Sequence, residues 1–367
     1  MQLSDLVTDV EKLTNISSQS ALVKRALGRA LDRISGTYPW PFYLDRSFIT
    51  TADDYSTGTL AITQGEKAVT GTSTVFTSAM VGRKIRVGSD QAYYTIASFT
   101  STTAITLLEP YQGTTVTAAT YVIYQDEYRL QANVDLIHFM KQIETGQALI
   151  DLDPGDYDLI WPTGNSYGDP SYVIPIGRRQ DTYATGTVTG TVSSTALTGT
   201  STSWTGEPGI SRGTRIRIGN YVYTVKSVDS DTAITLYEGL VVAASASVYT
   251  AYLDNVRIQL YELPNAQKNI VYRFYRRPAP LVNDYDEPDL PPSFHWLLIQ
   301  GALSELWAYK GDDNRRVTVE QTFAQGIQQM KMHFNNTTRI YRRRSQTETP
   351  LMRGPRYPSN FDVSVAR

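Results

Sequence analysis

Residues 71–76 read GTSTVF, and residues 199–204 read GTSTSW. Further matching stretches follow both in the same order: RKIRVG at 83–88 with TRIRIG at 214–219, and TAITLLE at 103–109 with TAITLYE at 232–238. A shared order at nearly constant offset over a whole block indicates duplication of one folding unit. We therefore predict two copies of one module, at 58–126 and 186–254. Two copies separated by other sequence do not make a solenoid.

Each module is rich in short runs of β-branched and aromatic residues. Glycine, serine, threonine and aspartate separate these runs and favour turns. The pattern predicts five or six short strands per module, folded as a small barrel or sandwich.

The two ends of the chain carry a different periodicity. Apolar residues recur at helical spacing within 3–35 and again within 292–334, where Pro292 is preorganised for a first helical turn. After the second module, residues 256–260 and 270–274 alternate apolar and polar around the turn at Pro264, which predicts a β-hairpin.

The predicted fold class is α+β. It comprises a helical bundle from the N- and C-terminal segments, a central β-sheet, two duplicated barrel or sandwich insertions, and an extended C-terminal tail. The predicted divisions are 1–57 (helices and entry strand), 58–126 (first module), 127–185 (central β segment), 186–254 (second module), 255–335 (hairpin and C-terminal helices) and 336–367 (basic tail).

Composition restricts the classes of partner. The 367 residues have a formal net charge of -2 and a pI near 6.0, which give no overall attraction to nucleic acid or to anionic membranes. No apolar run approaches the roughly 20 residues that span a bilayer, so we expect a soluble protein without membrane contact. The chain has no cysteine, which excludes disulfides and thiolate metal sites.

Catalytic and metal motifs have little support. Gly164–Gly168 matches the G-x-S-x-G nucleophile elbow, but Pro162 and Pro170 are incompatible with its strand-turn-helix context. The acidic run 151–158 has Asp156 where a calcium loop needs glycine at its sixth position, and Pro162 stands where the loop needs glutamate at its twelfth, so we interpret the run as a solvated turn. The three histidines, at 138, 295 and 333, have no partners at metal-ligand spacing. We expect no catalytic residue, cofactor or metal.

The tail from Asn336 is rich in arginine, with seven arginines against two acidic residues. The run Arg342-Arg343-Arg344 could neutralise DNA phosphates, or it could lie on an acidic neighbouring subunit. Both readings stay open from the residues alone.

Several stretches resemble the tailed-bacteriophage head-to-tail adaptor (connector) proteins. Residues 290–313 read LPPSFHWLLIQGALSELWAYKGDD and are followed by a helix at 320–330, which resembles the family's Pro-led helix, Lys-Gly-Asp break and final helix. The strand-like segment RFYRRP at 273–278 also resembles the family's pattern. The segment SAMVGRKIRVGSDQAYYTIAS at 78–98 resembles modules of phage adaptor and tail proteins.

The resemblance implies a non-enzymatic virion protein at the neck, made in the host cytoplasm. Such adaptors form a homo-oligomeric ring, commonly of about 12 subunits, beneath the portal protein. Tail or collar proteins would be further partners, and double-stranded DNA would pass through the channel without sequence-specific binding, as in genome ejection.

Two groups of residues receive roles from this resemblance. The portal- or neighbour-docking tail comprises Arg339, Arg342, Arg343, Arg344, Arg353, Arg356 and Tyr357. The helical body packs through Leu297, Leu298, Ala302, Leu306, Phe323 and Ile327.

Two other functions compete with the adaptor. A tail- or fibre-attachment protein would use the duplicated modules as its functional core. A carbohydrate-binding or depolymerase protein would use the 25 tyrosines and 5 tryptophans for stacking, and an enzyme of that kind would need a carboxylate pair in a cleft.

Overall fold

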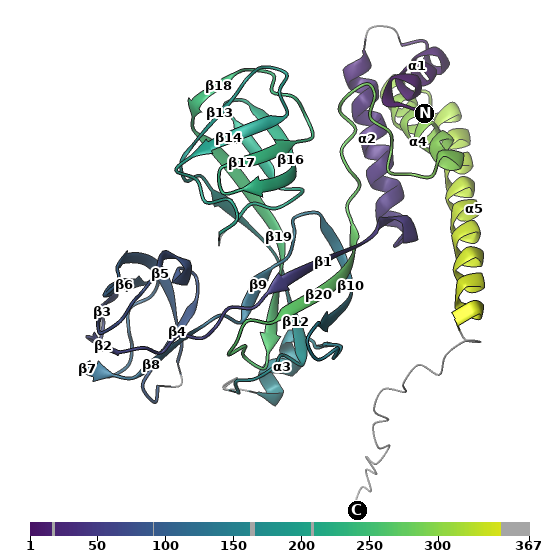
Figure 1. Cartoon of the computed structure of the whole chain (residues 1–367). Coiled ribbons are helices and arrows are strands. Elements are labelled where there is room, and N and C mark those ends of the chain that lie inside the picture. The colour runs from purple at the N-terminus through teal and green to yellow at the C-terminus, as the bar shows by residue number, and fades with distance from the viewer. Residues whose placement is uncertain (17–18, 91, 162–165, 207–208, 346–367) are drawn as a thin grey trace, which may run out of the picture. The chain divides into compact units, whose positions relative to one another are not determined.

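The computed structural model describes residues 1–16, 19–90, 92–161, 166–206 and 209–345. The fold mixes helices with extensive sheets and is mostly β (Figure 1). It divides into two units. The β-rich unit comprises Met1–Asp5 and Pro39–Leu290, and the helical unit comprises Leu6–Tyr38 and the chain from Pro291 onward.

The helices and short 3-10 turns within the described residues are α1 Leu3–Thr14, α2 Ser20–Thr37, α3 Pro154–Ile160, α4 His295–Lys310, α5 Asp313–Ser345, η1 Pro41–Tyr43, η2 Ser78–Met80 and η3 Pro292–Phe294. The strands outside the two predicted modules are β1 Leu44–Thr50, β9 Glu127–Arg129, β10 Val134–Gln142, β11 Ile150–Asp151, β12 Tyr172–Tyr183 and β20 Asn269–Arg276.

The first module contains β2 Thr59–Ile62, β3 Ala68–Thr72, β4 Lys84–Val87, β5 Tyr94–Ser101, β6 Ala104–Leu107, β7 Val116–Ala119 and β8 Tyr121–Tyr124. The second contains β13 Thr187–Gly190, β14 Ala196–Thr200, β15 Arg215–Ile218, β16 Tyr221–Ser230, β17 Ala233–Leu236, β18 Ala244–Ser247 and the start of β19 Tyr249–Tyr261.

The strands of the two modules pair in the same order. The first module runs β7-β2-β3-β6-β5-β4-β8, and the second runs β18-β13-β14-β17-β16-β15-β19. Each order has seven strands, where the sequence predicted five or six. The second module continues into the central body because β12 and β19 are long enough to belong to both.

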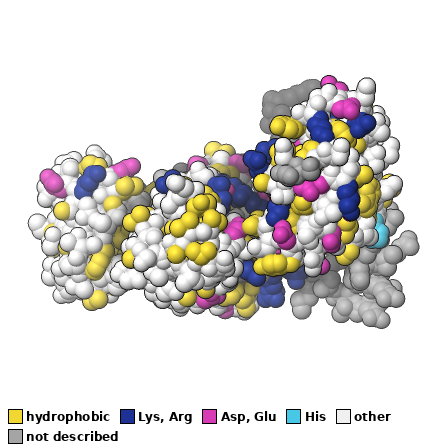
Figure 2. Space-filling view, turned by 90° about the horizontal axis from the view of Figure 1, so that it is seen from above, with side chains coloured by type: hydrophobic (Ala, Val, Ile, Leu, Met, Phe, Trp, Pro, Cys, Tyr) yellow, Lys and Arg dark blue, Asp and Glu magenta, His cyan; other side chains and the backbone are white. Residues whose placement is uncertain are grey.

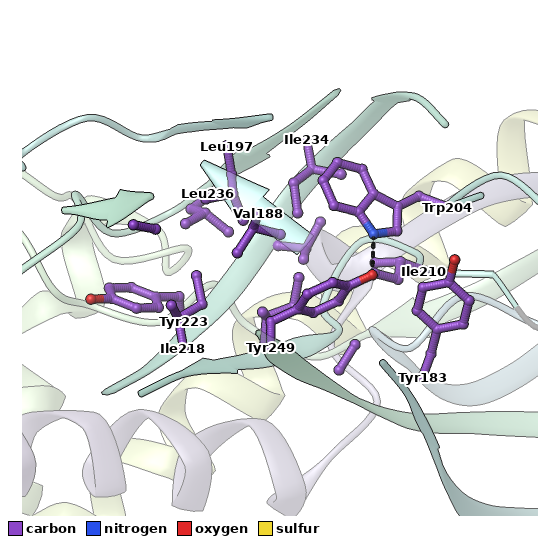
Figure 3. Close-up of a cluster of buried hydrophobic side chains, with 14 of the residues drawn as sticks. Tyr183, Val188, Leu197, Trp204, Ile210, Ile218, Tyr223, Ile234, Leu236 and Tyr249 are labelled. Carbon is purple, nitrogen blue, oxygen red and sulfur yellow. Dashed lines mark hydrogen bonds between the residues drawn. The ribbon is translucent and has the colours of Figure 1, made fainter. Parts of the chain in front are cut away.

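Matched side chains fill the two module cores. Trp204 of the second module donates its indole N–H to the hydroxyl of Tyr249 at 2.9 Å, within a core of aliphatic side chains (Figure 3). At the corresponding places in the first module, the rings of Phe76 and Tyr121 meet edge to face at 6.0 Å.

The turns of the two modules also match. Gly58 and Gly186 both have positive φ, and an added Cβ at either would lie 2.4 Å from the carbonyl oxygen of Thr72 or Thr200. Only glycine fits such a position. The two modules therefore have the same backbone conformation at these turns, so the repeated sequence corresponds to a repeated local structure.

The central body consists of two sheets that pack face to face. One has the order β1-β20-β10, and the other contains β11, β12 and β19, with β9 paired to β19. Alternate residues of β19 and β20, such as Ile258 and Tyr272, share one buried cluster. The prediction that these two strands form a hairpin was wrong, because each pairs with other strands in a different sheet. Their apolar and polar residues alternate because one side of each strand faces the opposite sheet across the core.

In the helical unit, α4 packs against α2 and α5. A Cβ added at Gly301 of α4 would lie 2.6 Å from the Cβ of Ala30 on α2, so the glycine allows close approach of the two helices. Arg33 of α2 lies over the ring of Phe323 of α5 and forms an ion pair with Glu320.

Two further predictions differ from the structure. The acidic run predicted as a turn contains helix α3, which begins because Asp153 accepts a hydrogen bond from the Gly155 N–H and Pro154 occupies the first turn. Helix α5 continues to Ser345, so the first residues of the segment predicted to be extended from Asn336 are helical.

Candidate functional site

The histidines lie on separate elements. His138 is exposed on β10 beside the ring of Tyr275, His295 is buried at the start of α4, and His333 contacts aromatic rings in the helical unit. No group of three or more metal-binding side chains forms among the described residues. Gly164 and Asn165 of the elbow pattern lie outside these residues, and the adjoining Ser166 bonds through its carbonyl oxygen to the Leu263 N–H.

A buried ion pair joins the first module to the central body. Lys84 of β4 lies 2.8 Å from Asp126 and 2.9 Å from Glu127, and both Lys84 and Asp126 are buried. Gln259 of β19 donates to the same Asp126 oxygen at 3.0 Å. Burial alone would lower the pKa of Lys84, but the two carboxylates outweigh burial and raise it.

The buried contacts between the second module and the body are uncharged hydrogen bonds, and the ion pair at this junction, between Asp254 and Arg277, is partly exposed. Asn255, at the position that matches Glu127, donates to the Leu130 carbonyl at 2.6 Å and to the Ser211 hydroxyl at 3.2 Å. Arg215, which matches Lys84, is exposed. The duplicated modules therefore have similar cores and different attachments.

A second charged contact lies where the chain leaves β20. Arg276 donates to Asp289 at 2.5 Å, and the Ala279 N–H donates to the same oxygen at 3.0 Å. Burial opposes ionisation of this carboxyl, but these hydrogen bonds outweigh burial and lower the pKa of Asp289.

We predict that Asp289→Ala lowers the free energy of unfolding at pH 7 by about 1.5–3 kcal/mol, because a hydrogen-bonded charge is lost. The folded pKa lies below the unfolded one, so the contribution is present above the unfolded pKa and is lost as pH falls through the folded pKa. Denaturant unfolding between pH 7 and pH 3 should show the wild-type and variant curves converging below about pH 4. A constant difference throughout would show that the carboxyl acts through packing alone.

The predicted body-packing residues are brought together in the helical unit. All six are buried: Leu297, Leu298, Ala302 and Leu306 on α4, and Phe323 and Ile327 on α5. They belong to the packing of α4 and α5 in the helical unit.

The predicted docking tail divides into two parts. The backbone of Arg339 and Arg342–Arg344 belongs to α5, whereas Arg353, Arg356 and Tyr357 lie outside the described residues. Elsewhere, Lys and Arg side chains occur together with Asp and Glu side chains over the face seen in Figure 2. A basic end on a long helix is therefore the feature that the sequence and structure share.

A family model described as SU10 adaptor protein matches residues 146–352, more than half of the chain. The chain belongs to the SU10 adaptor protein family. The match spans part of the central body, the second module, α4 and α5, and the first module precedes it. No curated protein sequence matches the chain.

Membership makes this adaptor a phage structural protein and a virion component that contacts other virion proteins. Within the described part of the adaptor, no helix is both long and apolar enough to cross a membrane.

Sequence reasoning missed the charged attachment of the adaptor's first module. The available signal was a difference inside the repeat, because Lys84 and Glu127 stand where the second module has Arg215 and Asn255. This difference between the two copies indicates where the site lies. It does not show which side chains are in contact, because Gln259, which bonds to Asp126, is distant in sequence.

Proposed function

We propose that this protein is a head-to-tail adaptor that forms a ring beneath the portal, joins the capsid to the tail and lines the channel through which DNA leaves. The family match carries the proposal, because it includes α4 and α5, whose C-terminal end contains Arg339 and Arg342–Arg344. A ring adaptor acts through shape and contact and needs no catalytic group.

In this proposal the helical unit holds the C-terminal segment for docking. The packed α4 and α5 give that segment a firm base, and its arginines can pair with carboxylates of the portal or of a neighbouring subunit. Double-stranded DNA in the channel would meet the adaptor without sequence-specific contacts. The β-modules would contact tail or collar proteins.

We predict that deletion of residues 346–367 leaves the fold intact and abolishes assembly on the portal. This truncation preserves α5, whereas deletion of 336–367 also removes the end of that helix and its arginines. Electron microscopy of the full chain mixed with the portal protein should show a closed ring stacked on the portal, about 12-fold if the symmetry matches the usual portal. Neither truncation should form that ring.

Hydrogen exchange of each truncated chain provides the control, because unchanged protection of α4 shows that the helical unit is still folded. A ring formed normally by both truncations would refute the docking role of the tail. If only the shorter deletion assembled, the arginines at the end of α5 would be the docking residues.

The position of the first module supports a second candidate, fibre attachment. That module lies outside the family match, so a separate role for it is compatible with family membership. Monomers or trimers at the periphery of the particle, in place of a ring on the portal, would favour fibre attachment.

A further inference from the structure

The three-stranded sheet β1-β20-β10 has one face packed in the core and an outer face that is exposed along β1, at Arg273 and over much of β10, although Val271 on this side is buried. Its register places Leu44, Tyr275 and Leu136 in one row, and Arg46, Arg273 and Phe139 in the next. Neighbouring residues on the strands point the other way, into the core shared with β19. We call the exposed side the outer sheet face, defined by Leu44, Arg46, Phe48, Leu136, Phe139 and Arg273.

The outer sheet face exposes large apolar side chains. Phe48 is 63% exposed and Leu136 is 53% exposed, and Leu44 and Phe139 are exposed as well. Soluble proteins seldom leave a contiguous apolar surface open unless it binds something. Arg46 and Arg273 are also exposed and give the face a positive charge at its centre.

A second exposed surface has the opposite charge. The segment Ile150–Ile160 reads IDLDPGDYDLI and contains four carboxylates and no cation. Leu159 is 81% exposed and Ile160 is 54% exposed beside Asp156 and Asp158, which are exposed too. We call these four residues the acidic ridge.

The acidic ridge has a rigid base. Tyr157 of α3 is buried, and its ring meets the ring of Tyr261 at 5.4 Å. Trp161 lies 4.6 Å from the same Tyr261 ring. These contacts fix one side of α3 to the sheet, so the other side presents the ridge without a large ordering cost.

We propose that the outer sheet face of one copy binds the acidic ridge of a second copy. The inference rests on the proposed ring, for which it supplies a subunit contact. Apolar side chains would meet apolar side chains, and Arg46 and Arg273 would face the carboxylates of Asp156 and Asp158. Since the two surfaces differ, the contact is heterologous and repeats from copy to copy in one direction, as a closed ring requires.

The charge of the outer sheet face also disfavours the chain's own tail as its occupant. The tail has seven arginines against two acidic residues, so Arg46 and Arg273 would repel it. The acidic ridge has the complementary sign.

The absence of cysteine permits a direct test in the full chain. Phe48→Cys and Leu159→Cys would be made singly and together, and assembled on the portal before treatment with a short bismaleimide. We expect the double variant to form a ladder of covalent oligomers and the two single variants, when mixed, to form dimers. Each single variant alone should give no covalent dimer. As a control for random collision, Val248→Cys replaces Leu159→Cys at an equally exposed site in the second module.

Charge reversal supplies a second readout. Arg46→Glu with Arg273→Glu should weaken association at least about 10-fold, because like charges would then face each other. Adding Asp156→Lys and Asp158→Lys in the same chain should restore it. Dimers formed by Phe48→Cys alone, or reversal without effect, would overturn the inference.

The two proposals fail in different ways. If the wild-type chain forms no ring on the portal, the proposed function is wrong. If the wild type forms the ring but the double cysteine variant yields no more cross-link than the Val248 control, only this subunit contact is wrong.

Discussion

Replacing Leu298 with aspartate is expected to unfold the helical unit locally or lower its stability by about 4 kcal/mol or more. The Leu298 side chain on α4 is 0% exposed, so the new carboxylate would be desolvated without a partner at this position. Hydrogen exchange resolved by peptide should show lost protection in α2, α4 and α5 and little change in the β-rich unit.

Two variants show whether the effect comes from the buried charge. Leu298→Ala removes packing alone and should cost about 2–5 kcal/mol. Val317→Asp places the same charge at an exposed position of α5 and should change stability by no more than about 0.5 kcal/mol. Equal protection in the Leu298→Asp variant and the wild type would mean that this face of α4 is not the core of the unit.

The duplication could be predicted because a repeated amino-acid sequence indicates a repeated local structure. Gly58 and Gly186 occupy equivalent turns with positive φ, and the paired motifs occupy equivalent strands. Helical periodicity likewise indicated α2, α4 and α5, because each has an apolar side that packs in the unit.

The central body was harder to predict, because alternation of apolar and polar residues is the same in two strands that pair within one sheet and in two strands from sheets that pack face to face. Residues 256–260 and 270–274 alternate as a hairpin would, yet they belong to opposite sheets of one core. A short connection brings the two strands together in either arrangement, and the choice depends on strands such as β1 and β12 that lie far away in sequence. Helix α3 was missed because its seven residues are too few for a clear 3.6-residue period.

Among the candidate sites, sequence indicated the basic C-terminal segment and the buried helix faces. It did not indicate the outer sheet face, because exposure of Phe48 depends on which side of β1 faces the core. It also could not show that Lys84 reaches Asp126, since 42 residues separate the pair. Contacts of this kind follow from the fold as a whole.

The buried pair at the first module gives the other large expected effect. Asp126→Ala should lower the stability of that module by about 3 kcal/mol, because the buried Lys84 loses one carboxylate and Gln259 loses its acceptor. Glu127 still lies within 2.9 Å of Lys84, which places the cost at the lower end for a broken buried pair. Hydrogen exchange should show lost protection in β4 and β8 of the first module, with the second module unchanged.

The second module provides the matched control within the same chain. Asp254 is the counterpart of Asp126, but it is only partly buried and meets the partly exposed Arg277 at 3.3 Å. Asp254→Ala should therefore cost less than about 1 kcal/mol. If both variants lose the same stability, the charged attachment of the first module has no special role.

A double replacement distinguishes the destabilisation caused by leaving one charge unpaired from the net contribution of the ion pair to stability. Lys84→Met with Asp126→Leu removes both charges and should restore stability to within about 1 kcal/mol of the wild type, because no charge is left buried alone. A double variant as unstable as Asp126→Ala would instead show that the pair itself, with its bond to Gln259, stabilises the module. Because Gln259 belongs to β19, that result would make the ion pair the element that fixes the first module to the adaptor's central body.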